Sequence, residues 1–221
     1  FQADASLVAG ITSIRTAGNS SVINLNATQA AAITATNTNA NPTLALKDAS
    51  GTADVMTITA SNSSSAANVT GLSLTGVETL NFRNSSAAAN TLSFATGASS
   101  GTTNTGLKNL VVTGAKGVTV DLNSNSAGTN TTYGNQVATL LSVDASGLTA
   151  QATGTNTFTL QDTNGGHALA NGLTITGSAG DDVISLGAGT DTLAAGVVAT
   201  INSGAGNDSV TVSAAQLYTS G

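Results

Sequence analysis

The sequence predicts an all-β protein, an elongated parallel β-solenoid or β-roll of short strands with at most one or two short helices. Short runs in which apolar and polar residues alternate fill almost the whole chain, and Gly, Asn, Ser and Thr separate them, as expected of repeated strands. Spacings of roughly 10 to 20 residues suit the coils of a solenoid, because one coil cannot bury its apolar face alone. A sandwich or barrel would also give short strands. Aromatic residues make up only 3% of the chain and glycine-aspartate repeats lie near its C-terminus, and both features favour the solenoid.

The expected strands share this alternation and are rich in Thr, Val and Ile, which favour β-structure. They are residues 6–14, 21–25, 43–46, 55–59, 72–74, 79–82, 91–94, 109–112, 118–122, 140–144, 157–161, 173–176, 183–186, 192–193, 199–201 and 209–212. Helix is expected only at residues 26–32, as one or two turns for which Asn26 is a good N-cap.

The composition excludes several classes of protein. With 40% hydrophobic and only 7% charged residues, the chain does not have the low hydrophobicity and high charge of a disordered protein. A net charge of −6 argues against general nucleic-acid binding, which needs a basic face, and no apolar run approaches the roughly 18 residues that span a membrane. Cysteine is absent, which fits an exported bacterial surface protein whose stability comes from something other than disulfides. The chain begins at Phe1 with no export signal before it, as expected of a piece of a longer secreted polypeptide.

The charged residues are unevenly distributed. All five Lys and Arg residues lie within the first 116 positions, whereas the segment from Gly117 onward contains seven Asp and no Lys or Arg. Unpaired carboxylates repel one another unless a cation neutralises them. The second half of the chain is therefore predicted to bind a metal ion.

The strongest motif is a Gly-x-Asp-x-aliphatic pattern that occurs three times, at residues 180–184, 189–193 and 206–210. Calcium takes roughly six to eight oxygen ligands from carboxylates and carbonyls, and glycine lets a turn adopt the positive φ that points carbonyls inward. The alternative is that these are ordinary turns of a solenoid, since turns are rich in Gly and Asp. The candidate calcium-binding residues are Asp181, Asp182, Asp191 and Asp208, with Gly180, Gly189, Gly206 and Asn207 in the turns.

These residues resemble the nonapeptide repeat of RTX proteins, G-G-x-G-x-D-x-U-x, which winds a parallel β-roll around calcium. Asp182 and Asp191 are nine residues apart, in phase with that repeat. In the family each ion lies between turns about eighteen residues apart. Asp191 and Asp208 are seventeen apart, and the residue eighteen beyond Asp182 is Thr200, so the resemblance implies one to three ions. The chain departs from the family pattern at Ser178, Leu186 and Ser203.

A second resemblance covers residues 71–212. The segments LTGVETLNF, LVVTGAKGVTVDL and SVDASGLTA, followed by the glycine-aspartate repeats, resemble calcium-dependent surface-layer (S-layer) proteins of Gram-negative bacteria of the Caulobacter type. This resemblance implies a rigid solenoid module that is secreted by a type I route and assembles with identical copies into a calcium-held lattice on the cell surface. Any contact with a cell-surface polysaccharide would be made by regions outside residues 1–221.

These considerations divide the chain into an N-terminal solenoid segment (1–70), a second solenoid segment (71–176), the calcium-binding turns (177–212) and the start of a following module or linker (213–221). Two other functions are weighed. GVETLN also occurs in large RTX adhesins, so a spacer module of such an adhesin is the main alternative. A β-helical enzyme acting on polysaccharide is disfavoured because the Asp-rich half has no basic residue, and His167 has no second His or Cys for a zinc site. We therefore predict no enzymatic activity and no catalytic residue.

Overall fold

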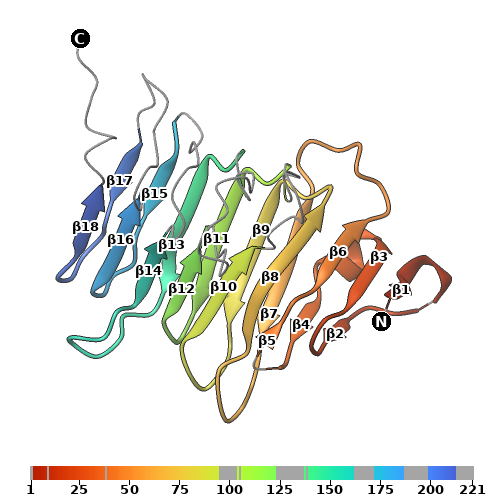
Figure 1. The fold of residues 1–221 in the computed structure, drawn as a ribbon, viewed down its shortest axis with the longest axis horizontal. Helices are drawn as coiled ribbons and strands as arrows, with labels where there is room; N and C mark the ends of the chain where they lie inside the picture. The colour runs from red at the N-terminus through yellow and green to blue at the C-terminus, as the bar shows by residue number, and fades with distance from the viewer. Residues whose placement is uncertain are drawn as a thin grey trace, which may run out of the picture.

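The computed structural model is a stack of coils in which two parallel β-sheets face each other along the length of the molecule (Figure 1). The structure describes residues 2–8, 10–37, 39–94, 104, 106–122, 137, 139–161, 172–186 and 199–212. The predicted all-β, parallel solenoid of short strands is confirmed.

The described residues contain two short helical elements and eighteen strands. The helical elements are the 3-10 turn η1 (Ala5–Leu7) and the helix α1 (Ala27–Ala30). The strands are β1 (Gln2–Asp4), β2 (Ile14–Thr16), β3 (Ser21–Leu25), β4 (Ile33–Ala35), β5 (Asn39–Ala40), β6 (Thr43–Leu46), β7 (Val55–Ala60), β8 (Asn68–Thr75), β9 (Thr79–Asn84), β10 (Asn90–Phe94), β11 (Asn109–Gly114), β12 (Val118–Asp121), β13 (Ser142–Leu148), β14 (Phe158–Gln161), β15 (Thr174–Thr176), β16 (Asp182–Leu186), β17 (Thr200–Asn202) and β18 (Ser209–Val212).

From β7 to β18, each coil places one strand in each sheet. The order in sheet 1 is β1-β3-β6-β8-β10-β12-β14-β16-β18, with β5 also pairing with β8, and the order in sheet 2 is β17-β15-β13-β11-β9-β7-β4-β2. The number of residues per coil varies widely. Ile14 pairs with Ile33, 19 residues on, whereas Val120 pairs with Leu160, 40 residues on. Chain distance therefore does not reveal which residues lie side by side.

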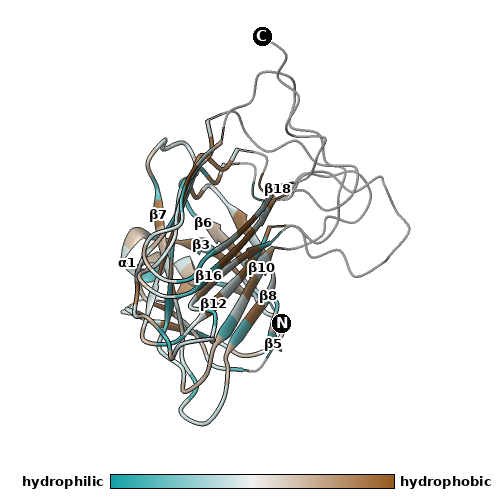
Figure 2. Cartoon of the chain, turned by 90° about the vertical axis from the view of Figure 1, so that its left-hand side faces the viewer, coloured by the Kyte–Doolittle hydropathy of each residue, from teal (hydrophilic) through white to brown (hydrophobic). Residues whose placement is uncertain are grey.

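Inward-facing aliphatic side chains form ladders along both sheets. Figure 2 looks along the stack and colours the chain by hydropathy. In sheet 2 the ladder is Met56, Leu80, Leu110, Val143, Ile175 and Ile201. In sheet 1 it is Val69, Leu92, Val120, Leu160, Ile184 and Val210. Every member except the last of each ladder is fully buried, and Val210 is 45% exposed. Because a fully buried aliphatic side chain contributes roughly 1.5–3 kcal/mol, these ladders hold the stack together.

The N-terminal region differs most from the sequence prediction. The predicted strand 6–14 is wrong, because the Asp4 carboxylate accepts hydrogen bonds from the backbone N–H and hydroxyl of Ser6 and starts η1 there. Leu7 then lies 81% exposed, so the apolar residues of this segment do not form a buried strand face. Strands β1, β2, β4 and β5 were not predicted, apart from Ile14 at the start of β2. The predicted strand 192–193 and residues 213–221 lie outside the described residues.

The predicted helix is confirmed in a shorter form. The side chain of Asn26 accepts the backbone N–H of Gln29, and the Gln29 side chain accepts the backbone N–H of Asn26. This reciprocal capping box fixes the start of α1.

The proposed division of the chain stays a prediction. Strand β8 runs across the boundary at residue 70, and sheet 1 continues past residue 176 into β16 and β18. No helix within the described part of the chain is long and apolar enough to cross a membrane.

Candidate calcium-binding turns

The last two described coils carry the glycine-aspartate turns, one stacked on the other. Residues 177–181 connect β15 to β16, and residues 203–208 connect β17 to β18. Since Val183 pairs with Ser209 in the parallel ladder, the two turns are related by 26 residues. The stacking aligns Gly180 with Gly206, Asp181 with Asn207, and Asp182 with Asp208.

Asp182 is the first residue of β16, and its carboxylate is buried, with only 1% of the residue exposed. One oxygen, Oδ1, accepts the backbone N–H of Phe158 in the previous coil at 3.0 Å and the Ser178 hydroxyl at 2.6 Å. The other, Oδ2, accepts the backbone N–H of Ser178 at 2.6 Å. Burial raises the pKa of Asp182, the hydrogen bonds from Ser178 and Phe158 oppose this, and the nearby charge of Asp208 adds to the rise. Asp182 therefore fixes the turn between two coils at an electrostatic cost.

Asp181 lies at the surface of the same turn and links three coils. Its Oδ1 accepts the backbone N–H of Asn207 at 2.9 Å, in the following coil, and its Oδ2 accepts the backbone N–H of Gly154 at 3.0 Å, in the preceding one. These two hydrogen bonds, from Asn207 first and then Gly154, lower the pKa of Asp181. The group is thus held as a carboxylate.

Asp208 repeats the role of Asp182 one coil further on. Its Oδ1 accepts the backbone N–H of Asp182 at 3.0 Å, as Asp182 accepts that of Phe158. A neutral residue does the same in an earlier coil, where the side-chain oxygen of Asn90 accepts the backbone N–H of Ala67 at 2.7 Å. In the described chain, the Oδ2 atom of Asp208 makes no hydrogen bond. It is therefore the one carboxylate oxygen of the described turns without a hydrogen bond, which favours it as a cation ligand.

Glycine is required where the two turns touch. Gly206 has a φ of +123°, and a Cβ atom there would lie 2.6 Å from the carbonyl carbon of Gly180. Gly204 has a φ of +96°, and a Cβ there would collide with the carbonyl oxygen of Ser178. Side chains at these positions would separate the coils, so the glycines set the close approach of backbone oxygens.

Two candidate residues, Gly189 and Asp191, lie outside the described residues. The remaining six are brought together by the stacked turns, but the spacing differs from the RTX-based expectation. Thr200 pairs with Thr174 at the start of β17, and the residue one coil beyond Asp182 is Asp208. The expected period of about eighteen residues is therefore wrong for this coil, which takes 26 residues.

Acidic residues in earlier coils have different surroundings. Glu78 is buried and accepts the backbone N–H of Asp54, 24 residues earlier. Asp48 accepts the backbone N–H and hydroxyl of Ser50 within its own turn. His167 lies outside the described residues.

Sequence reasoning missed Ser178 and Gly154, whose N–H groups hold Asp182 and Asp181. A signal for Ser178 was present, because Gly177-Ser178-Ala179-Gly180-Asp181-Asp182 aligns with Ser203-Gly204-Ala205-Gly206-Asn207-Asp208 at an offset of 26 residues. This alignment would have paired the two turns. The partnership with Gly154 leaves no comparable trace in the sequence.

The type of ligand atom that these turns offer fits calcium. Their side-chain ligands are oxygen atoms, which calcium prefers. The described residues alone do not make a complete site, since nowhere among them do three or more His, Cys, Asp or Glu side chains gather around one point. A full set of roughly six to eight ligands requires backbone carbonyls and further residues of the repeat.

Comparison with known families supports calcium as the metal that this part of the chain binds. The family described as RTX calcium-binding nonapeptide repeat (4 copies) matches residues 174–197, which include β15, the first turn and β16. No curated protein and no solved structure matches the chain. RTX nonapeptide repeats are calcium-binding, typically structural rather than catalytic, and indicate an extracellular protein. Over residues 174–197 the chain is thus similar to RTX calcium-binding proteins, and the expectation of calcium as its cofactor is confirmed at the level of this repeat.

Proposed function

We propose that this chain is a structural module of a bacterial surface layer, exported by a type I route and assembled from identical copies into a calcium-dependent two-dimensional lattice. The observation that carries the proposal is the direct stacking of RTX-like turns on the end of a continuous two-sheet solenoid. Such an arrangement places the metal-dependent part of the molecule in register with a rigid scaffold. The resemblance of residues 71–212 to S-layer proteins is the reason for proposing that the copies assemble into a lattice.

In the proposed calcium site, Asp208 and Asp181 supply carboxylate oxygens from two adjacent coils. Asp191 and the carbonyls of Gly180, Gly189 and Gly206 complete the ligand set, with Asn207 beside them. Asp182 positions the turn through Ser178 and Phe158. When bound, the ion neutralises carboxylates that otherwise repel, so it favours the folded coils through linkage.

The outward face of sheet 2 suits side-by-side packing of copies. Its register columns are formed largely by short polar side chains, as in the column Thr79, Asn109, Ser142, Thr174 and Thr200. Short side chains at the regular spacing of a parallel sheet, about 4.8 Å, give a flat surface that a second flat surface can approach closely. This supports lattice contacts through sheet faces.

The second candidate is a spacer module of a large RTX adhesin. The same elongated stack favours it, because a rigid rod separates a membrane end from a binding tip without needing contacts between copies. The two functions differ in what calcium does after folding. An S-layer module assembles, whereas a spacer stays monomeric.

The test is a calcium titration of the purified chain, with magnesium and a chelator as controls. Thermal melting reports the stability, light scattering reports assembly, and electron microscopy reports whether assemblies are ordered sheets. We expect calcium, and not magnesium, to raise the melting temperature and then to produce ordered sheets. Stabilisation without assembly would favour the spacer, and no response to calcium would contradict both functions.

A further inference from the structure

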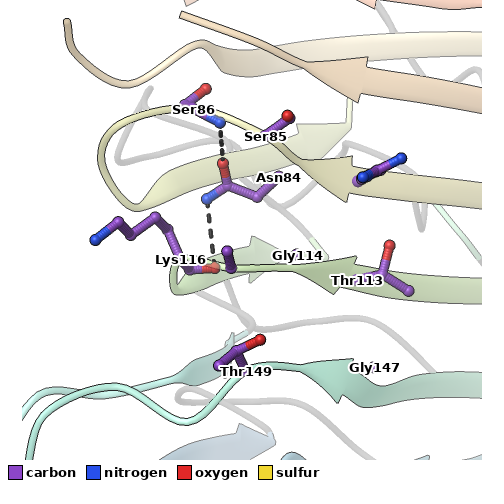
Figure 3. Close-up of a pocket in the computed structure, with 10 residues that line it drawn as sticks. Asn84, Ser85, Ser86, Thr113, Gly114, Lys116, Gly147 and Thr149 are labelled. Carbon is purple, nitrogen blue, oxygen red and sulfur yellow. Dashed lines mark hydrogen bonds between the residues drawn. The ribbon is translucent and has the colours of Figure 1, made fainter. Parts of the chain in front are cut away.

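A second candidate binding site lies in the middle of the solenoid, away from the calcium-binding turns. Where β9, β11 and β13 end, residues of three successive coils line a hollow of about 500 Å³ (Figure 3). The hollow is lined by the chain's Arg83 and Lys116, two of its five basic residues, and by no acidic residue. In a chain with eleven acidic residues, this is a local reversal of charge.

The hollow exists because side chains shorten along one register column. Arg83 pairs with Thr113, and Thr113 pairs with Gly147, on the outward face of sheet 2. A Cβ atom at Gly147 would lie 2.7 Å from Cγ2 of Thr113, so this glycine allows the two coils to approach. The missing side chain at Gly147 leaves the space beyond Arg83 open.

The rim of the hollow is held rigidly. The buried Asn84 side chain donates to the carbonyl of Gly117 at 3.0 Å and to that of Lys116 at 3.4 Å, and it accepts the backbone N–H of Ser86 at 2.9 Å. Figure 3 shows Asn84 between the turn that carries Ser86 and the turn that carries Lys116. The position of the backbone on both sides of the hollow is therefore set before any ligand arrives.

The polar side chains of the hollow are free to bind. Within the described part of the chain, the side chains of Arg83, Lys116, Ser85, Thr113 and Thr149 make no hydrogen bond or ion pair, and all five are exposed or half-buried. Two cations favour an anionic group, since charge-assisted hydrogen bonds to carboxylate or sulfate are the strongest such contacts. Three hydroxyls add donors and acceptors suited to a ligand that itself carries hydroxyls.

We propose that this hollow binds an acidic oligosaccharide, with Arg83 and Lys116 on its carboxylate or sulfate groups and the three hydroxyls on the sugar hydroxyls. An inorganic ion would occupy only a small part of 500 Å³, a volume in the range of sites for small organic ligands. Three coils about 4.8 Å apart span about 10 Å, which suits two or three sugar residues. Nucleic acid fits poorly, because the hollow has no aromatic side chain for base stacking. None of the residues assigned to calcium lines the hollow, and because the hollow opens on the outward face of sheet 2, binding is measured on chain that light scattering shows to be unassembled.

The test measures binding of sialyllactose, trigalacturonate and a sulfated disaccharide to the calcium-saturated full chain by calorimetry. Neutral lactose and sodium sulfate are the ligand controls. The test variant is Arg83→Gln/Lys116→Gln. Its matched control, Arg15→Gln/Lys47→Gln, removes the same two kinds of charge at residues that do not line this hollow. Thermal melting verifies that both variants fold.

We expect saturable binding of at least one acidic sugar, no measurable binding of lactose, and a loss of at least about tenfold in affinity in the test variant only. No saturable binding of any acidic sugar would overturn the proposal. An equal loss in both variants would also overturn it, since the effect would then be that of net charge. Sulfate binding as tightly as the sugars would reduce the hollow to a simple anion site and overturn the saccharide assignment.

Discussion

Two substitutions at Asp208 separate its structural role from its role toward calcium. The carboxylate has one oxygen engaged with the backbone N–H of Asp182 and another that makes no hydrogen bond within the described residues. Asp208→Asn keeps a side-chain oxygen for that N–H and removes the charge, as Asn90 does where it accepts the N–H of Ala67. Asp208→Ala removes both.

The expected magnitudes follow from these contacts. In chelator, Asp208→Ala leaves the N–H of Asp182 without its partner, which at this half-buried site costs about 1 kcal/mol and lowers the melting temperature by about 2–4 °C. Asp208→Asn changes the calcium-free stability by less than about 0.5 kcal/mol, because the acceptor remains and a charge close to Asp182 is removed. In calcium, both variants lose a charged ligand. A tenfold weaker affinity removes about 1.4 kcal/mol of linkage stabilisation, or about 3–6 °C.

The measurement is thermal melting of the wild-type chain and the two variants in chelator and in saturating calcium, with calorimetric titration of calcium for each. Wild-type calcium affinity in Asp208→Asn would refute the assignment of Asp208 as a ligand. Equal destabilisation of the two variants in chelator would refute the claim that its hydrogen bond to Asp182 is what supports the calcium-free turn.

Two further predictions concern the same turns. Gly206→Ala is expected to lower the free energy of unfolding, measured by urea denaturation, by about 2 kcal/mol more than Gly172→Ala does. Both glycines have positive φ (+123° and +82°), but only at Gly206 would a Cβ meet the backbone of the neighbouring turn. Equal losses would show that the coils do not touch there. The pKa of Asp182 is raised on folding, so the native state binds more protons than the unfolded chain above the ordinary value of 3.8, and calcium-free stability should fall as pH rises through that window. Asp182→Asn should flatten this fall in melting temperature as pH rises above 3.8, and an unchanged slope would assign the dependence to other groups.

Much of the fold could be predicted because alternation in single strands is a local signal. The predicted bounds 21–25, 43–46 and 209–212 match β3, β6 and β18, since each run of inward aliphatics is bounded by turn residues. The N-cap of α1 could also be predicted, because Asn26 and Gln29 have the spacing of a capping box. The failure at residues 6–14 came from Asp4, whose carboxylate competes with strand pairing by holding the N–H of Ser6.

The pairing of the candidate ligands could not be predicted in the same way. Which residue follows Asp182 in the ladder depends on the number of residues in one coil, and that number ranges from 19 to 40 in this chain. A period borrowed from RTX proteins pointed to Thr200, whereas the stack selects Asp208. Nor does alternation indicate that Gly154 would hold Asp181, because that contact joins a turn to another turn 27 residues earlier.

One register position agrees with the proposed calcium site in the last two described coils. In sheet 1 the residues at this position are Asn90, Val118, Phe158, Asp182 and Asp208 in successive coils. The first of these satisfies a backbone N–H without a charge, the next two are apolar, and only the last two are carboxylates. A buried carboxylate in this position provides the same hydrogen bond as Asn90 but carries a desolvation cost, which a neutral side chain avoids. The placement of Asp at these two coils is therefore not required by the solenoid itself, and the proposed calcium site, in which Asp208 is a ligand and Asp182 positions the turn, gives a reason for it.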